Sequence, residues 1–244
     1  MREVSRAPLD PKRPATFSML RVPFFLEPDY PRSEDFEETN RVRLHRKWGG
    51  EEKFLLQKQR HRLKERGWAV GIPKFDLDRI ASSTFAAHRL VQYVTKTVSV
   101  DAAERLYADL NYRHFEKGRK LNNREMLVEC AAHVGIDETE ARAFLESDEG
   151  TEEIERAQHM LDQLGVHSIP TLCVGGQHLV TAAVPHQVTV QHLRQLEAME
   201  PDERGKGWLF AEPLGIPQHV LDAPLDLGSG VADDAAEMEL GSTG

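Results

Sequence analysis

Cysteine is scarce in this sequence, because its 244 residues include only Cys130 and Cys173. Two thiols are too few for the disulfide framework of a small secreted protein, and these two lie too far apart to form a C-x-x-C motif. Cys130 with His133, and Cys173 with His167 and His178, have the side chains of metal ligands. Metal sites are usually built from more closely paired ligands, however. We therefore predict neither a disulfide scaffold nor a metal site.

Long apolar runs and an excess of positive charge are also lacking. No stretch approaches the roughly 20 apolar residues of a membrane-spanning helix, and the N-terminus MREVSRAPLDPKRP lacks the apolar core of a secretory signal. The chain has 31 Lys and Arg against 40 Asp and Glu, whereas nucleic acids and anionic membranes bind clustered basic residues. We expect a cytoplasmic protein with no nucleic-acid or membrane partner. A mitochondrial presequence is the alternative for the Arg-containing terminus.

The composition is that of a globular protein, with 40% hydrophobic and 29% charged residues. It suffices for one domain with a helical insertion. Residues 1–15 hold three prolines and are predicted to form an irregular lead-in. Residues 16–26, TFSMLRVPFFL, have the aromatic and aliphatic content of a strand. Residues 201–244 mix Gly, Pro and acidic residues and are predicted to be a mostly disordered tail, although the apolar group Trp208 to Phe210 is able to dock on a core.

Between these ends the pattern is first helical and then mixed. Residues 36–145 show helical periodicity with cap signals, such as the Gly pair ending EETNRVRLHRKWGG, and predict a bundle of helices. Residues 148–199 predict a helix, the short strands TLCV and HLVTA joined by a GGQ turn, and a final helix. The basic runs RVRLHRK and KQRHRLKERG alternate with apolar helix positions. We interpret them as solvated helix faces rather than as nucleic-acid binding surfaces.

Six motifs in fixed order connect these elements to a known family: FFLEPDYP, WGGEE, STFAAHRL, FEKGRKLNN, ARAFLESDEG and LGVHSIPTLCVGG. Together they resemble the DsbA-like branch of the thioredoxin superfamily, in particular FrnE-like and 2-hydroxychromene-2-carboxylate isomerase-like proteins. The resemblance covers roughly residues 20–197. It implies an α/β protein with a thioredoxin-like fold and a large helical insertion, in a domain spanning residues 16–200.

The resemblance implies a role for Pro170. Proteins of this superfamily have a cis-proline at the start of the strand after the last insertion helix, beside the redox-active dithiol. Pro170 matches that position, so we predict a cis Ile169–Pro170 peptide that opens the first strand of the hairpin. The main-chain N–H and C=O of Ile169 would then be available to an extended substrate. The structural alternative is that Pro170 simply begins an edge strand, where proline is tolerated.

The same resemblance points to a missing segment. The family carries C-x-x-C, or a serine in the isomerase and glutathione-transferase relatives, at the start of the helix after its first strand, where the helix N-terminus favours a thiolate. The first strand predicted here corresponds to the family's second. We therefore expect an N-terminally incomplete domain with no assignable catalytic residue. An incomplete gene model or splice form, a degenerate protein and a sheet completed by another chain are the three explanations, and we favour the first.

Ser83, Thr84 and His88 are the remaining candidate substrate-binding residues. The resemblance implies that this polar stretch faces the active-site cleft, although Ser83 stands where many relatives have Asn. The structural alternative makes Ser82 to Thr84 helix N-cap residues, with His88 packing one turn later.

For function, the resemblance implies a protein disulfide oxidoreductase that acts on protein or peptide thiols and disulfides, or on a small thiol, without a cofactor. Because the dithiol is absent, we predict that the chain as written is inactive in exchange. Strand alternation from Pro170 predicts that Cys173 is a buried, inert core thiol. The alternatives are a glutathione-dependent isomerase or transferase of the same fold and a non-catalytic binding protein. A homodimer is left open.

Overall fold

The computed structural model describes residues 1–76, 78–175, 178–181, 184–200 and 208–228, with only the backbone at 178–181. The chain divides into two compact units. Unit 1 holds the described parts of Met1–Phe24, Thr95–Asp101 and Gly150–Gly244, and unit 2 holds Phe25–Val94 and Ala102–Glu149. Within the described ranges, no helix combines the length and apolarity needed to cross a membrane.

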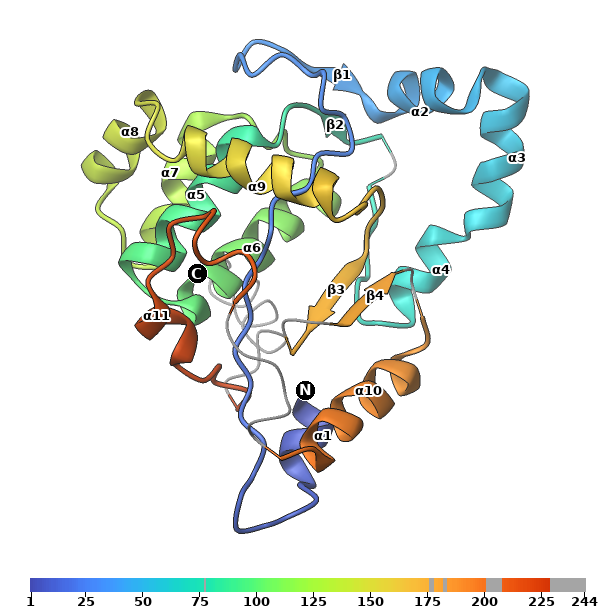
Figure 1. Cartoon of the computed structure of the whole chain (residues 1–244). Helices are drawn as coiled ribbons and strands as arrows, with labels where there is room; N and C mark the ends of the chain where they lie inside the picture. Colours follow the sequence, from blue (N-terminus) through green and yellow to red (C-terminus); the bar gives the residue numbers. More distant parts are fainter. Residues whose placement is uncertain (77, 176–177, 182–183, 201–207, 229–244) are drawn as a thin grey trace, which may run out of the picture. The chain divides into compact units, whose positions relative to one another are not determined.

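Unit 2 is mainly helical (Figure 1). Its two short strands, β1 (Glu38–Thr39) and β2 (Ile80–Ala81), pair antiparallel. Between them runs a helical arm, and after them comes a helix bundle. The arm consists of α2 (Asn40–Trp48), α3 (Glu51–His61) and α4 (Leu63–Trp68), and the bundle of α5 (Phe85–Thr97), α6 (Val100–Phe115), α7 (Arg124–His133) and α8 (Glu138–Glu146). The predicted helical insertion is confirmed.

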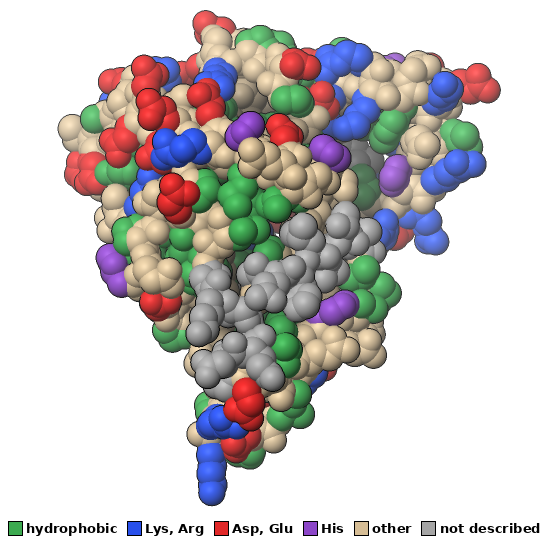
Figure 2. Space-filling model, viewed as in Figure 1, with side chains coloured by type: hydrophobic (Ala, Val, Ile, Leu, Met, Phe, Trp, Pro, Cys, Tyr) green, Lys and Arg blue, Asp and Glu red, His purple; other side chains and the backbone are tan. Residues whose placement is uncertain are grey.

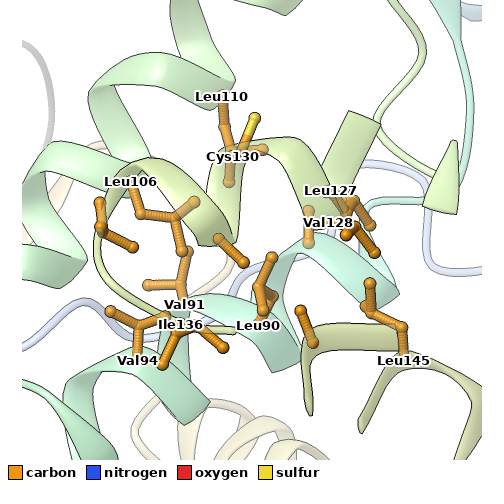
Figure 3. Close-up of a cluster of buried hydrophobic side chains, with 14 of the residues drawn as sticks. Leu90, Val91, Val94, Leu106, Leu110, Leu127, Val128, Cys130, Ile136 and Leu145 are labelled. Atoms are coloured by element: carbon orange, nitrogen blue, oxygen red, sulfur yellow. The ribbon is translucent and has the colours of Figure 1, made fainter. Parts of the chain in front are cut away.

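The core of unit 2 is made by the apolar stripes of α5 to α8 (Figure 3). Leu90 and Val94 lie one turn apart on α5 and are fully buried, as are Leu106 on α6 and Leu127 on α7. Burying one such side chain stabilises the fold by about 1.5–3 kcal/mol. The helical spacing of these residues therefore predicted the elements correctly, because each helix buries one stripe.

Caps in the sequence fix where several helices begin and end. Thr39, Asn123 and Asp137 each accept a main-chain N–H from the first turn of the helix that follows. These side chains satisfy donors that have no partner within the helix. At the other end of α2, Gly49 has φ +80°, a left-handed conformation that glycine adopts without a Cβ penalty. The WGG motif predicted this helix end.

Unit 1 has the predicted order of helix, two strands and helix between residues 148 and 199. After α9 (Thr151–Gln163), β3 (Thr171–Val174) pairs antiparallel with β4 (His178–Thr181), with Thr171 opposite Thr181 and Val174 opposite His178. The long helix α10 (His186–Ala198) follows and packs against the short N-terminal helix α1 (Arg2–Arg6). A further short helix, α11 (Gln218–Asp222), lies near the end of the described chain.

The strand predicted at residues 16–26 is wrong. These residues form no regular element, and the described strands pair only as β1 with β2 and β3 with β4. Isolated contacts replace a ladder: Leu225 N donates to Phe17 O at 2.7 Å, and Gln158 Nε2 donates to Pro23 O at 2.7 Å. A strand-forming composition yields a strand only where a partner backbone lies alongside, because the ladder satisfies its polar groups.

Both ends of the chain pack more than the sequence predicted. The lead-in begins with α1, which precedes the first proline and fully buries Val4. In the tail, Leu214 and Leu221 are fully buried and Phe210 is nearly so. The prediction of an irregular lead-in and a largely unpacked tail is therefore wrong for these residues, whereas the docking considered for Trp208 to Phe210 agrees with the burial of Phe210. A few apolar side chains are enough to hold such a segment when they are removed from water. Residues 201–207 and 229–244 lie outside the described chain.

Candidate functional site

The candidate site of unit 1 is the turn between α9 and β3. After α9, Gly165 adopts φ +67° and donates to Asp162 O, and Val166 N donates to Leu161 O. These bonds end the helix and direct the chain toward β3. The Ile169–Pro170 peptide is cis and immediately precedes β3, which is the geometry predicted from the sequence.

The surface at this turn is apolar and accessible. The Ile169 side chain is 50% exposed and that of Leu172 is 43% exposed. Thr171 Oγ1 donates to Ser168 O at 2.7 Å, which closes the turn before the strand. Among the described residues, none exchanges a main-chain hydrogen bond with Ile169. The turn thus offers one peptide group and an apolar side chain to an approaching chain.

Cys173 lies on β3 and is exposed, so the prediction that it is buried in the core is wrong. Alternation places Leu172 and Cys173 on opposite faces of the strand, yet both are exposed. Burial requires a covering layer as well as the correct face, and a two-stranded hairpin does not supply one by itself. The side chain of His178, which the sequence placed near Cys173, lies outside the described atoms.

Ser83, Thr84 and His88 belong to unit 2, where they surround the start of α5. The Ser83 hydroxyl is buried and accepts the N–H of Phe85 at 3.3 Å, and Thr84 O accepts the N–H of His88 at 3.0 Å. These contacts are the ones expected of residues that start a helix. The His88 ring meets the Phe25 ring edge-on at a centroid distance of 5.3 Å.

Sequence reasoning missed Asn122 as an organising residue of this region. It is 3% exposed, and its Nδ2 lies within hydrogen-bond distance of the carbonyl oxygens of Ser33, Glu34 and Phe36, at 2.9, 3.3 and 2.8 Å. Its main-chain N–H donates to Ser82 Oγ at 3.3 Å. Asn122 therefore joins the loop before α2 to the start of α5. The motif FEKGRKLNN includes Asn122 and was the one sequence feature that marked this residue. Its contacts with three carbonyl groups far away in the sequence cannot be predicted from residue spacing.

Cys130, the other thiol, is fully buried in the core of unit 2 (Figure 3). Burial, and next the neighbouring Asp109 carboxylate, raise the pKa of the Cys130 thiol far above its usual value. Asp109 also accepts hydrogen bonds from His133 Nδ1 and Arg113 Nε, both at 3.0 Å. A thiol whose pKa is raised remains protonated near neutral pH and is a poor nucleophile.

The candidate residues thus fall into two groups. Ile169 and Pro170 lie in unit 1, and the helix-start residues Ser83, Thr84 and His88 lie in unit 2. Within the part of the chain that the structure describes, no three His, Cys, Asp or Glu residues are grouped to hold a metal ion.

Comparisons with known proteins agree with this architecture. The model of the family described as DSBA-like thioredoxin domain matches residues 16–194. Among solved structures, a probable DsbA oxidoreductase from Streptomyces coelicolor is similar, with a TM-score of 0.62 and 27% sequence identity over 73% of this chain and 75% of that chain. No curated protein sequence matches significantly.

Proposed function

The chain belongs to the DSBA-like thioredoxin domain family, and from this premise we propose that it binds thiol- or disulfide-containing polypeptides at the Ile169–Pro170 turn. The observation that carries the proposal is the accessible turn before β3, where Ile169 is half-exposed and exchanges no main-chain hydrogen bond with a described residue. An extended peptide laid along this turn would pair with the main chain of Ile169. Strand addition of this kind gains affinity from main-chain hydrogen bonds and specificity from neighbouring side chains.

Exchange chemistry needs more than binding. A thiolate must attack a disulfide sulfur, and a second thiol must then release the product. Cys130 is buried and its pKa is raised, and Cys173 lies on a strand rather than at the helix N-terminus that would favour its thiolate. The 244 residues contain no C-x-x-C sequence. We therefore propose that this chain binds such polypeptides but does not exchange disulfides by itself.

The second candidate is a glutathione-dependent isomerase or transferase of the same fold, with glutathione bound as the small thiol. We rank it lower because the hydroxyls of Ser82 and Ser83 are buried and each accepts a main-chain N–H, so neither is presented as the serine of such an enzyme. Within the family, the six motifs together resemble FrnE-like and isomerase-like proteins, and we propose the FrnE-like assignment with the cytoplasm as the location.

The proposal is tested by binding of an extended cysteine-containing peptide, measured by calorimetry and by amide shifts of ¹⁵N-labelled protein. We expect shifts at Ile169 and Thr171, and weaker binding by Ile169→Ala because the exposed side chain contributes contact area. Val98→Ala, which shortens an apolar side chain of the same unit that is 43% exposed, is the control. Equal affinity of both variants, or shifts confined to other residues, would reject this binding site. Glutathione is titrated in parallel, and preferential binding of glutathione would favour the second candidate.

A further inference from the structure

Charge is distributed very unevenly along the chain. Residues 40–68, which form the helical arm, contain ten Lys or Arg against three Asp or Glu, whereas the remaining residues contain 21 against 37. Figure 2 shows basic side chains gathered over the arm and acidic side chains over α8 and the start of α9. Within α2, Arg43 and Arg46 pair with Glu27 and Glu38. The charge is therefore partly neutralised at the base of the arm, whereas toward its end the described residues form one exposed pair, Arg62 with Glu65 at 3.8 Å.

At the end of the arm the basic charge surrounds an exposed apolar tip. Trp68 and Val70 are each 74% exposed, and the turn is held by the Trp68 Nε1 bond to Pro73 O at 3.1 Å and by Ile72 N donating to Gly67 O at 2.9 Å. Lys64, Arg66 and Lys74 are exposed beside it. None of these three cations forms an ion pair with a described residue. We call Lys64, Arg66, Trp68, Val70 and Lys74 the basic tip.

A groove of opposite character lies in unit 1, along one side of α9. It has a volume of about 640 Å³ and is lined by Glu152, Glu155, Arg156, His159, Met160, Gln163, Glu212 and Pro213. We call this set the acidic groove. Its single guanidinium is already engaged, because Arg156 donates to Pro213 O at 3.2 Å and lies 3.7 Å from Glu152. Glu152, Glu155 and Glu212 are exposed in this lining, which also includes the apolar side chains of Met160 and Pro213.

We propose that the basic tip of one copy of this chain docks in the acidic groove of a second copy. The two surfaces are complementary in both respects: an apolar projection with basic flanks meets an apolar floor with an acidic rim. Aromatic anchors with a rim of opposite charge are the usual composition of a binding hot spot. Because every copy carries both surfaces, the contact joins like copies, either as a closed pair with two reciprocal contacts or as a longer chain of copies. A second copy is favoured over other acidic partners because both halves of the contact are present on this chain.

The contact is expected to be reversible and sensitive to salt. A stable interface buries about 800 Å² per partner, so we expect the contact to include exposed residues of α3 as well as the tip. Leu55 and Leu56, 48% and 47% exposed, extend the apolar surface there, and Lys53, Lys58 and Arg60 extend the basic one. Exposed charges attract less at high ionic strength, so salt should weaken the association.

The experiment is sedimentation velocity of the full chain across micromolar concentrations, at low and at high salt. We expect dimers or larger assemblies that dissociate as salt rises. Trp68→Ala should weaken association about 30-fold, the value for loss of one hot-spot aromatic. The exposed double variant Lys12→Glu with Arg105→Glu, which changes the net charge as much as reversing two charges of the tip, is the control and should associate as the parent does.

Charge reversal makes the test specific. Lys64→Glu with Arg66→Glu reverses the tip, and Glu152→Lys with Glu155→Lys reverses the groove. Each double variant should be monomeric alone, because its tip and groove then carry charge of the same sign. An equimolar mixture of the two should associate again, because the tip of each variant then meets a groove of opposite charge on the other. Circular dichroism confirms that each variant is folded. A chain that is monomeric at every concentration, or a mixture that fails to associate, overturns the proposal. A monomer that binds anionic phospholipid vesicles through Trp68 also overturns it, in favour of a lipid surface.

Discussion

Arg89 is predicted to be a major determinant of stability in unit 2. It is only 6% exposed, and its guanidinium donates to three carbonyl oxygens at the C-terminal end of α8 and beyond: to Glu149 at 2.7 Å, Ser147 at 2.6 Å and Phe144 at 3.2 Å. It also lies 4.9 Å from the centroid of the Phe144 ring. Burial lowers the pKa of Arg89, yet the positive charge remains favourable beside the negative end of the helix dipole.

Arg89→Met keeps most of the stem and removes the donors. Hydrogen bonds to a charged group contribute about 1.5–3 kcal/mol each, part of which offsets desolvation of the guanidinium. We therefore expect a net loss of about 3 kcal/mol in the free energy of unfolding. At about 2–4 °C per kcal/mol for a chain of this size, the melting temperature should fall by roughly 6–12 °C. Urea denaturation followed by helical circular dichroism measures the loss directly.

Arg142 on α8 is the matched control. It pairs with Glu125, but both side chains are largely exposed, 43% and 66%, and exposed pairs stabilise by about 0–1 kcal/mol. Arg142→Met should thus barely change the urea midpoint. If Arg89→Met lowers the free energy of unfolding no more than Arg142→Met does, the hydrogen bonds from the guanidinium to the three carbonyls do not stabilise this helix end, and our explanation is wrong.

Three further predictions concern chemistry, pH and the loop before α2. The purified chain should not reduce a protein disulfide, and the double variant Cys130→Ser with Cys173→Ser should behave identically; a rate in the parent that the variant loses would reveal an unrecognised redox pair. His114 accepts a hydrogen bond from Arg79 at 3.0 Å, and burial and then the Arg79 charge lower the pKa of His114 from 6.5 to about 4. As pH falls, the unfolded chain therefore takes up this proton before the folded chain does. The free energy of unfolding should be highest above pH 6.5 and fall by about 3 kcal/mol at most as pH approaches 4. In urea titrations, His114→Gln should lose less stability over that interval than the parent, and an equal loss contradicts the assignment. Asn122→Ala should cost about 2 kcal/mol, because three carbonyls lose their shared buried donor; an unchanged urea midpoint would show that water replaces it.

The sequence predicted what depends on neighbours along the chain. Helical spacing placed the buried stripes of α5 to α8, because positions three and four apart share a helix face. The WGG motif predicted the end of α2, since only a left-handed residue satisfies that cap at little cost. The family motifs together predicted the fold with its helical insertion and the position of Pro170 at the start of β3.

Only the tertiary structure decided what depends on residues far apart in the sequence. Residues 16–26 have a strand-forming composition but pair with no described strand. Cys173 has the alternation of a core residue but is exposed in the part of the chain that the structure describes. Asn122 and Arg89 acquire their carbonyl partners from segments about 55 to 89 positions away, and Leu214 and Leu221 are buried because a surface receives them. Periodicity and caps are local properties, whereas strand pairing, burial and the partners of buried polar groups are set by which distant segments the fold brings into contact.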